Sequence, residues 1–184
     1  MTAYVALLRG INVGGKNLIR MAALKACFEE QGFGDVATYI QSGNVVFTAR
    51  RSNQRVLTRQ IEAALSSGFA YQPRVVVCSL VQLRAIVDGA PKGFGTRPAS
   101  YRYDVIFLKD PLTAGEAMNS VSAKPGVDRV SCGEGVIYFS RLISQAAQSH
   151  LSRIVGTPAY QQMTVRNWNT TGKLLELLER LGPP

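Results

Sequence analysis

Hydrophobic positions along the first half of the chain follow the periods of alternating strands and helices. A continuous apolar run at 3–8 is typical of a buried strand, and apolar residues within 21–28 recur at helical spacing. Short β-branched and aromatic runs at 36–41 and 45–49 flank turn residues 42–44, which is the chemistry of an antiparallel hairpin. The pattern predicts, in order, a strand at 3–8, a helix at 21–28, strands at 36–41 and 45–49, a helix at 56–65 and a strand at 74–79.

A similar order of elements returns in the second half, after a segment rich in glycine and proline. That segment, residues 91–100, defeats both regular periods and is interpreted as a linker between domains at 1–90 and 101–184. The later elements are predicted as a helix at 80–88, a strand at 102–108, a helix at 114–121, strands at 127–131 and 136–140, a helix at 145–155, a strand at 163–165 and a helix at 171–181. The predicted fold is α/β (α+β): two ferredoxin-like βαββαβ subdomains with an extra C-terminal helix.

Length and cysteine content narrow the class of protein. The chain has 184 residues, 46% of them hydrophobic, which is enough to bury a sizeable core. Cys27, Cys78 and Cys132 lie in largely apolar stretches without metal-ligand spacing, so we expect reduced, buried thiols. No apolar run approaches the ~18 residues of a membrane span, and no leader segment is expected. These features predict a soluble cytoplasmic protein that does not bind membranes, and they leave its oligomeric state open.

The charge balance favours an anionic partner. The chain has 21 Lys and Arg against 12 Asp and Glu, a formal net charge of +9, and most of its cations are arginine. Arginine is the better bidentate partner for phosphate, so nucleic acid or another polyanion is a plausible ligand. The cations are spread along the chain, however, and an ordinary solvated surface explains them equally well.

Residues 9–17 follow the first predicted strand as a glycine-rich loop with cationic side chains. Glycines let main-chain N–H groups converge on an anion, and the cations add formal charge. The spacing of Gly10, Gly15 and Lys16 matches a P-loop until Asn17, where that motif needs a hydroxyl for magnesium, so an NTPase is disfavoured. A non-hydrolytic anion site and a tight structural turn both remain open. The candidate ligand-binding residues here are Arg9, Gly10, Asn12, Gly14, Gly15, Lys16 and Asn17.

A second polar cluster, residues 166–171, joins the last predicted strand to the last helix. One interpretation is that its Asn and Thr side chains cap the free N–H groups of that helix. The other is that Arg166 and the helix N-terminus hold an anion, while the single tryptophan, Trp168, stacks on a base or packs in the core. The candidate ligand-binding residues here are Arg166, Asn167, Trp168 and Asn169.

Three segments, 9–15, 39–47 and 164–170, together resemble the bacterial family called domain of unknown function 1697. All three occur in order over nearly the whole chain. The resemblance implies two α/β subdomains, of which the first is ferredoxin-like, and it implies no established activity.

Catalytic and metal-binding patterns are weak. His150 is the only histidine, and Ser149 and Ser152 beside it show no evident alignment for a relay. Acids are scattered rather than clustered, so no metal site and no cofactor are predicted. The run Lys92 to Gly95 imitates the start of an RNA-binding sheet motif, but the following residues break it, and we set that match aside.

The leading hypothesis is a protein that binds a phosphate-bearing ligand, nucleotide or nucleic acid, in a cleft where residues 9–17 and 166–171 of the two subdomains meet. The first alternative is a phosphoryl- or nucleotidyl-transfer enzyme in which Lys16 and Arg166 stabilise phosphate charge and Asp104 or Asp110 supplies an acid or base. The second is a structural or partner-binding module with an exposed apolar sheet surface. The residues do not decide whether the protein is an enzyme, and catalytic residues stay unassigned.

Overall fold

The computed structural model describes residues 1–182 and divides into two compact units. The first unit contains residues 1–84 together with residues 173–182, and the second contains residues 85–172. The division passes through the helices α3 (Leu80–Asp88) and α5 (Trp168–Leu181), whose two ends therefore belong to different units.

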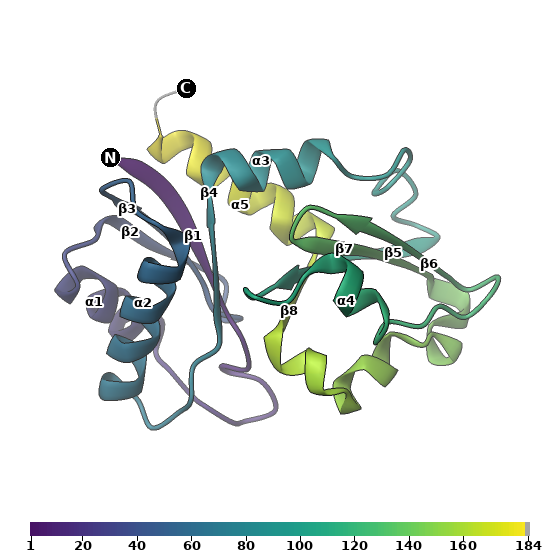
Figure 1. Ribbon diagram of the computed structural model, residues 1–184, viewed down its shortest axis with the longest axis horizontal. Helices are drawn as coiled ribbons and strands as arrows, with labels where there is room; N and C mark the ends of the chain where they lie inside the picture. Colours follow the sequence, from purple (N-terminus) through teal and green to yellow (C-terminus); the bar gives the residue numbers. More distant parts are fainter. Residues whose placement is uncertain (183–184) are drawn as a thin grey trace. The chain divides into compact units, whose positions relative to one another are not determined.

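The first unit is built on a four-stranded antiparallel sheet (Figure 1). Its elements before α3 are β1 (Thr2–Leu8), α1 (Met21–Glu30), β2 (Gly34–Tyr39), β3 (Asn44–Ala49), α2 (Gln54–Gly68) and β4 (Val75–Ser79). The strand order across the sheet is β2-β3-β1-β4, so β1 and β3 are central. Every element predicted for residues 3–79 is present, with ends that differ by a few residues.

The core of the first unit lies between one sheet face and the helices α1 and α2. Alternate β1 residues Tyr4, Ala6 and Leu8 face the buried side chains of both helices because successive strand residues point to opposite faces. An aromatic cluster fills the centre, with Phe47 in contact with the rings of Tyr4, Phe28 and Phe33 at centroid distances of 4.6 to 5.7 Å. Within the same unit, the end of α5 lies against α3, where Arg84 and Glu179 form an ion pair at 3.1 Å.

The second unit repeats this arrangement with a sheet of order β6-β7-β5-β8, also antiparallel throughout (Figure 1). Its elements are β5 (Tyr101–Leu108), α4 (Ala114–Met118), β6 (Asp128–Gly133), β7 (Val136–Leu142), three short 3₁₀ segments η1 (Ile143–Gln148), η2 (Leu151–Gly156) and η3 (Pro158–Gln162), then β8 (Met163–Asn167) and the start of α5. One sheet face packs on α4 and η2 through Ile106, Phe139 and Ile154.

Two predictions for this unit are wrong in detail. The expected helix at 145–155 consists of separate 3₁₀ turns, because polar and small residues in this stretch leave only Leu151 and Ile154 as buried anchors. The expected helix at 114–121 ends at Met118, although its start is well defined by a capping box between Thr113 and Glu116.

The architecture confirms a mixed α+β protein with two four-stranded antiparallel sheets. No helix within residues 1–182 is both long enough and apolar enough to span a membrane. Cys27 and Cys78 are buried free thiols, as expected, but Cys132 is exposed because it lies on the edge strand β6.

Candidate functional site

One face of the second sheet presents aromatic, cationic and hydroxyl side chains near the start of β5, whereas Val105, Phe107 and Val136 on the same face are fully buried. Alternation along the three strands places Tyr101 and Tyr103 of β5 on this face. It also places Arg129 and Ser131 of β6, and Tyr138 and Ser140 of β7, on the same face. The apolar residues between them, such as Ile106 and Phe139, point to the opposite face.

Strand register aligns these side chains in a row across the sheet. Arg129 is the cross-strand partner of Ser140, and Ser140 is the partner of Tyr103. A second row pairs Ser131 with Tyr138. Because serine is small, Ser140 and Ser131 leave the sheet hollow between larger neighbours.

Residues 91–100, which were predicted as a linker, form an ordered segment beside this hollow. Its turns are closed by main-chain hydrogen bonds from the Phe94 N–H to Pro91 and from the Thr96 N–H to Gly93. The main-chain N–H of Arg97 also donates to the Tyr103 hydroxyl oxygen at 3.2 Å. The first two bonds close turns within the segment, and the third joins it to β5. We call residues 91–100 the strap.

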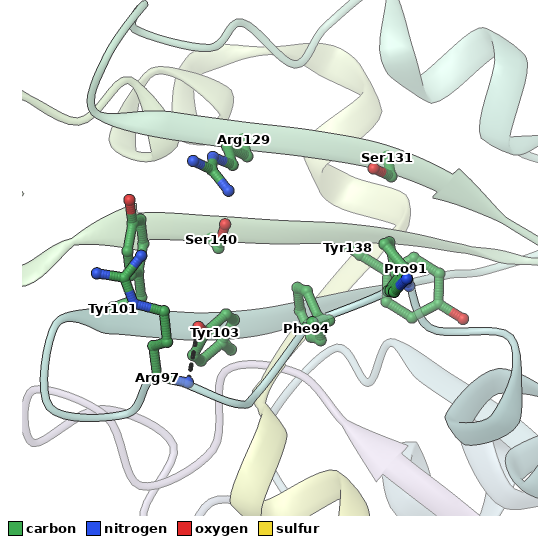
Figure 2. A pocket seen from close by; sticks show the side chains of 11 residues that line it. Pro91, Phe94, Arg97, Tyr101, Tyr103, Arg129, Ser131, Tyr138 and Ser140 are labelled. Carbon is green, nitrogen blue, oxygen red and sulfur yellow. Dashed lines mark hydrogen bonds between the residues drawn. The ribbon is translucent and has the colours of Figure 1, made fainter.

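The strap and the sheet face line a half-open pocket with a cavity volume of about 120 Å³ (Figure 2). Its walls come from three strands and the strap, all within the second unit. The lining residues are Pro91, Lys92, Gly93, Phe94, Arg97, Tyr101, Tyr103, Arg129, Ser131, Tyr138 and Ser140. None of these described residues is an acid, so positive charge in the pocket lacks a carboxylate counterion from its own walls.

One end of the pocket is cationic. The guanidinium carbon of Arg97 lies 5.3 Å from the centre of the Tyr101 ring, and that of Arg129 lies 5.6 Å from the same centre. Both distances are within the range of cation–π attraction, which offsets part of the repulsion between two like charges brought to one ring. Figure 2 shows both guanidinium groups beside Tyr101.

The other end is aromatic. The Phe94 ring meets Tyr103 and Tyr138 edge to face, at centroid distances of 4.9 and 5.4 Å, and Figure 2 shows Phe94 on the side of Tyr138 and Pro91. The Tyr138 hydroxyl donates to the carbonyl of Ile86 at 2.6 Å, and burial raises the pKa of Tyr138. Phe94 also packs edge to face against Trp168 at a centroid distance of 5.1 Å. The indole therefore contacts a residue of the pocket lining without belonging to the lining itself.

The glycine-rich loop at 9–17, in the first unit, forms an exposed turn. Val13 and Lys16 pair as an isolated bridge around Gly14 and Gly15, both with positive φ, which is the pattern of a tight two-residue turn. The Lys16 N–H donates to Val13, and Lys16 itself is exposed.

The side chains of the two asparagines of the loop form hydrogen bonds with main-chain groups of the same unit. The Asn12 side chain accepts from the Ile19 N–H at 2.8 Å and donates to the carbonyls of Ile19 and Gln41. The Asn17 amide donates to the Gly10 carbonyl at 2.8 Å. Arg9 is half-buried, and its main-chain N–H continues the sheet by donating to Arg74.

The second predicted cluster begins in β8. Arg166 is 9% exposed, its guanidinium donates to the Val165 carbonyl at 2.9 Å, and desolvation lowers its pKa to about 10. The Asn167 side chain accepts from the Thr170 N–H at 2.7 Å, which confirms the helix-capping interpretation for this residue. Trp168 is half-buried and Asn169 is exposed.

The two predicted clusters belong to different units, and a cleft shared between them stays a prediction. Their candidate roles in ligand binding likewise stay predictions.

A smaller polar group surrounds the single histidine. His150 Nδ1 lies 3.4 Å from the Ser122 hydroxyl, and the His150 main-chain N–H donates to Asp128, which also accepts from Lys124. The Asp128 carboxylate therefore links the loop before β6 to the residue that precedes η2, which is a structural role. Among residues 1–182, no three side chains of His, Cys, Asp or Glu are close enough together to hold a metal ion.

Sequence reasoning missed the pocket residues because it treated 91–100 as a linker and examined strands for burial alone. A signal was present: the polar or aromatic members of β5, β6 and β7 recur with period two, as in Tyr101 and Tyr103 or Arg129 and Ser131. The strap carried a second signal, the set-aside run at Lys92 to Gly95, whose Phe94 does contact a sheet, although from a loop.

The fold is that of an α+β protein with two antiparallel sheets of equivalent strand order. The second sheet carries a pocket lined by basic and aromatic side chains. The chain belongs to a family described as "Protein of unknown function (DUF1697)", whose sequence model matches residues 1–138. The resemblance inferred from its sequence segments is therefore confirmed.

Comparison with solved structures supports the fold. The chain is similar to the conserved bacterial protein SP0830 from Streptococcus pneumoniae, with 26% sequence identity and a TM-score of 0.85. The likeness covers 97% of this chain and 99% of that one. Comparison with curated proteins gives no match.

Proposed function

We propose that this protein binds an anionic, phosphate-bearing ligand, a nucleotide or nucleic acid. The observation that carries the proposal is the convergence of Arg97 and Arg129 on the Tyr101 ring in a pocket without an acid of its own. Two guanidinium groups that line one pocket are suited to bidentate hydrogen bonds with phosphate oxygens.

Binding explains the pocket better than phosphoryl or nucleotidyl transfer does. Its lining offers arginine, lysine, tyrosine and serine but no carboxylate or imidazole to act as a general acid or base near neutral pH. Asp104, suggested by the enzyme alternative, belongs to the opposite face of β5, where it pairs with Arg141 at 3.5 Å. A ligand held by charge and stacking needs none of these groups.

We also propose a ferredoxin-like topology for both units. It is supported by the equivalent strand orders β2-β3-β1-β4 and β6-β7-β5-β8 and by the antiparallel pairing within each sheet. In such a fold the helices cover one sheet face. The pocket of the second unit lies on part of the other face, beside the buried side chains of Val105, Phe107 and Val136.

The experiment is a titration of the protein with adenosine 5′-monophosphate and with a 5′-phosphorylated oligonucleotide, at about 50 and 300 mM salt. Trp168 emission reports binding through Phe94, and equilibrium dialysis measures it independently. We expect affinity to fall at the higher salt and to fall about tenfold in Arg129→Gln, since a charge-assisted hydrogen bond is lost.

Arg102→Gln is the matched control. Arg102 lies on β5 between Tyr101 and Tyr103, points to the other sheet face and is exposed, so its loss changes net charge equally. Equal weakening by both variants, or dialysis that detects no binding of either probe, would rule out the pocket as a phosphate site.

Residues 9–17 and 166–171 remain a separate proposal for anion binding. Lys16→Gln tests it, because this exposed side chain should contribute to affinity only if the glycine-rich loop holds the ligand. Unchanged affinity in Lys16→Gln together with loss in Arg129→Gln would assign binding to the pocket alone.

A further inference from the structure

We infer that the pocket accepts a single nucleotide unit that ends in a phosphate monoester, with the base at the aromatic end and the phosphate at the cationic end. This inference rests on the proposed function and specifies its ligand. It applies to a free nucleoside 5′-monophosphate and to the 5′-phosphorylated end of a strand, which share this chemistry.

The pocket is chemically divided along its length. Arg97, Tyr101 and Arg129 lie together at one end, whereas Phe94 and Tyr138 lie toward the other, with Tyr103 between (Figure 2). Tyr138 is only 2% exposed, so the aromatic surface open to a ligand belongs to the half-buried Phe94 and Tyr103. A phosphate alone would satisfy the first end and leave the aromatic end unused. A ligand that joins a planar ring to a phosphate satisfies both ends, because bases stack on aromatic side chains through their π-faces.

The sheet surface between the two ends of the pocket has short side chains, which leave room for a planar ring. Ser140 is 5% exposed and sits in the row between Arg129 and Tyr103, so a short side chain separates two long ones. Ser131 beside it is also short, and both hydroxyls can donate or accept hydrogen bonds at the edge of a base or at a ribose.

The strap limits the ligand to one unit. Sheet surfaces that bind running single strands are open, so that successive bases stack on successive strands. Here Pro91 to Arg97 lies beside the sheet face and narrows the space over it to a half-open cavity of about 120 Å³. That space suits one ring rather than a series of stacked bases.

The positive charge favours a terminal phosphate over an internal one. A monoester carries about −1.5 to −2 charges near neutral pH, whereas a diester within a strand carries one. The pocket lining contains two arginines and one lysine and no acid, so a monoester matches its charge more closely.

The first test compares adenosine and uridine 5′-monophosphates with ribose 5-phosphate and with the nucleosides, by dialysis at one salt concentration. Of the two nucleotides, the one with the higher affinity should bind at least about tenfold more tightly than ribose 5-phosphate or its own nucleoside. Stacking of the base and binding of the phosphate each contribute to its affinity. Ribose 5-phosphate bound as tightly as the nucleotides would overturn the inference while leaving the proposed function intact. Failure of every phosphate probe would overturn both.

A second test separates the two sources of the ligand. A 5′-phosphorylated tetranucleotide is compared with the same strand bearing a 5′-hydroxyl. Binding only by the mononucleotide indicates a free nucleotide, and binding by both it and the phosphorylated strand indicates that strand ends also enter. Equal affinity of the 5′-hydroxyl strand would show an internal site and contradict the inference.

Substitutions in the pocket test whether the base of the nucleotide lies at the aromatic end. Phe94→Leu should weaken nucleotide binding about tenfold yet leave ribose 5-phosphate binding unchanged, because only stacking is removed. Should Phe94→Leu fail to fold, Ser131→Leu fills the space over the sheet surface instead, and Cys132→Leu on the same strand but the opposite face is its control. Equal effects of Ser131→Leu and Cys132→Leu would contradict a base at this position.

Discussion

At the scale of single residues, the strap depends on glycine in a way that its neighbours do not. Gly95 has φ +84°, and a Cβ there would lie 2.3 Å from Trp168 Nε1. Gly93 has nearly the same φ, +82°, but a Cβ there would meet only Thr96 Oγ1 at 3.8 Å. The two positions therefore separate backbone strain from steric overlap.

We expect Gly93→Ala to lower the free energy of unfolding by about 1–2 kcal/mol, the cost of a left-handed conformation with a Cβ. Gly95→Ala should cost about 1–3 kcal/mol more, because the indole must move. Urea denaturation of both variants measures the difference, and a shift of Trp168 emission should accompany Gly95→Ala alone. Equal losses in the two variants would mean that the strap is free to move away from Trp168.

Two carboxyl groups should give opposite pH dependence. Burial raises the pKa of Asp104 from 3.8, despite nearby Arg141 and Arg102, whereas hydrogen bonds from Thr113 lower that of Glu116 from 4.5. The native state therefore holds the Asp104 proton more tightly than the unfolded chain does, and this group's contribution to stability falls as pH rises from about 4 through its folded pKa. The contribution of Glu116 is present above 4.5 and disappears as pH falls through its folded pKa.

Stability measured by urea unfolding between about pH 3 and 7 tests this assignment. Over this range, the free energy of unfolding of Asp104→Asn should increase more with pH than that of the unsubstituted protein. The free energy of unfolding of Glu116→Gln should increase less. The same direction of change in both variants would contradict it.

At the scale of helices and strands, the order of elements could be predicted because each strand of the first unit has a clear hydrophobic period and each helix a clear amphipathic one. The hairpin at 36–49, for example, is marked by its turn residues and becomes β2 and β3. The 3₁₀ turns at η1 and η2 could not be predicted in this way, because two buried residues in a polar stretch resemble a weak helix.

The site was harder to predict than the fold. Strap residues such as Phe94 and Arg97 acquire their role only by tertiary contact with β5, which no local period encodes. Conversely, the conspicuous glycines of 9–17 predicted a special backbone correctly, but the sequence could not distinguish turn geometry from ligand contact. The helix cap at Asn167 was one of two interpretations that local chemistry allowed.

The start of α2 offers a test at this scale. The Asn53 side chain accepts from the Arg55 N–H at 2.8 Å and caps the helix. Asn53→Ala should lower the free energy of unfolding by about 1 kcal/mol, whereas Asn53→Asp keeps the acceptor and should cost little. Chemical denaturation of both variants measures this, and an equal loss in Asn53→Asp would exclude capping as the reason.

At the scale of the whole molecule, the net charge of +9 produces a general attraction for polyanions that is distinct from the pocket. A long strand samples the field of all exposed cations, whereas a mononucleotide senses only its own site. Equivalent strand orders in the two sheets also mean that the pocket is not a property of the topology, because the first unit has the same order with other side chains.

We therefore expect a 5′-hydroxyl strand of about 20 nucleotides to bind weakly, with an affinity that falls linearly against salt on logarithmic axes. Arg102→Gln and Arg129→Gln should weaken it to a similar extent, since each removes one charge. Their effects on mononucleotide binding should differ about tenfold. A much larger effect of Arg129→Gln on the long strand would indicate that strands bind mainly through the pocket.

The exposed thiol of Cys132 allows this protein to be labelled at a single site. Burial raises the pKa of Cys78 to about 12 and also raises that of Cys27, so neither forms the reactive thiolate readily. A maleimide reagent should thus attach at one place, on the pocket-bearing strand β6 but directed to its reverse side. Immobilisation or dye attachment through this single sulfur would leave the arginine and tyrosine side chains accessible to solutes.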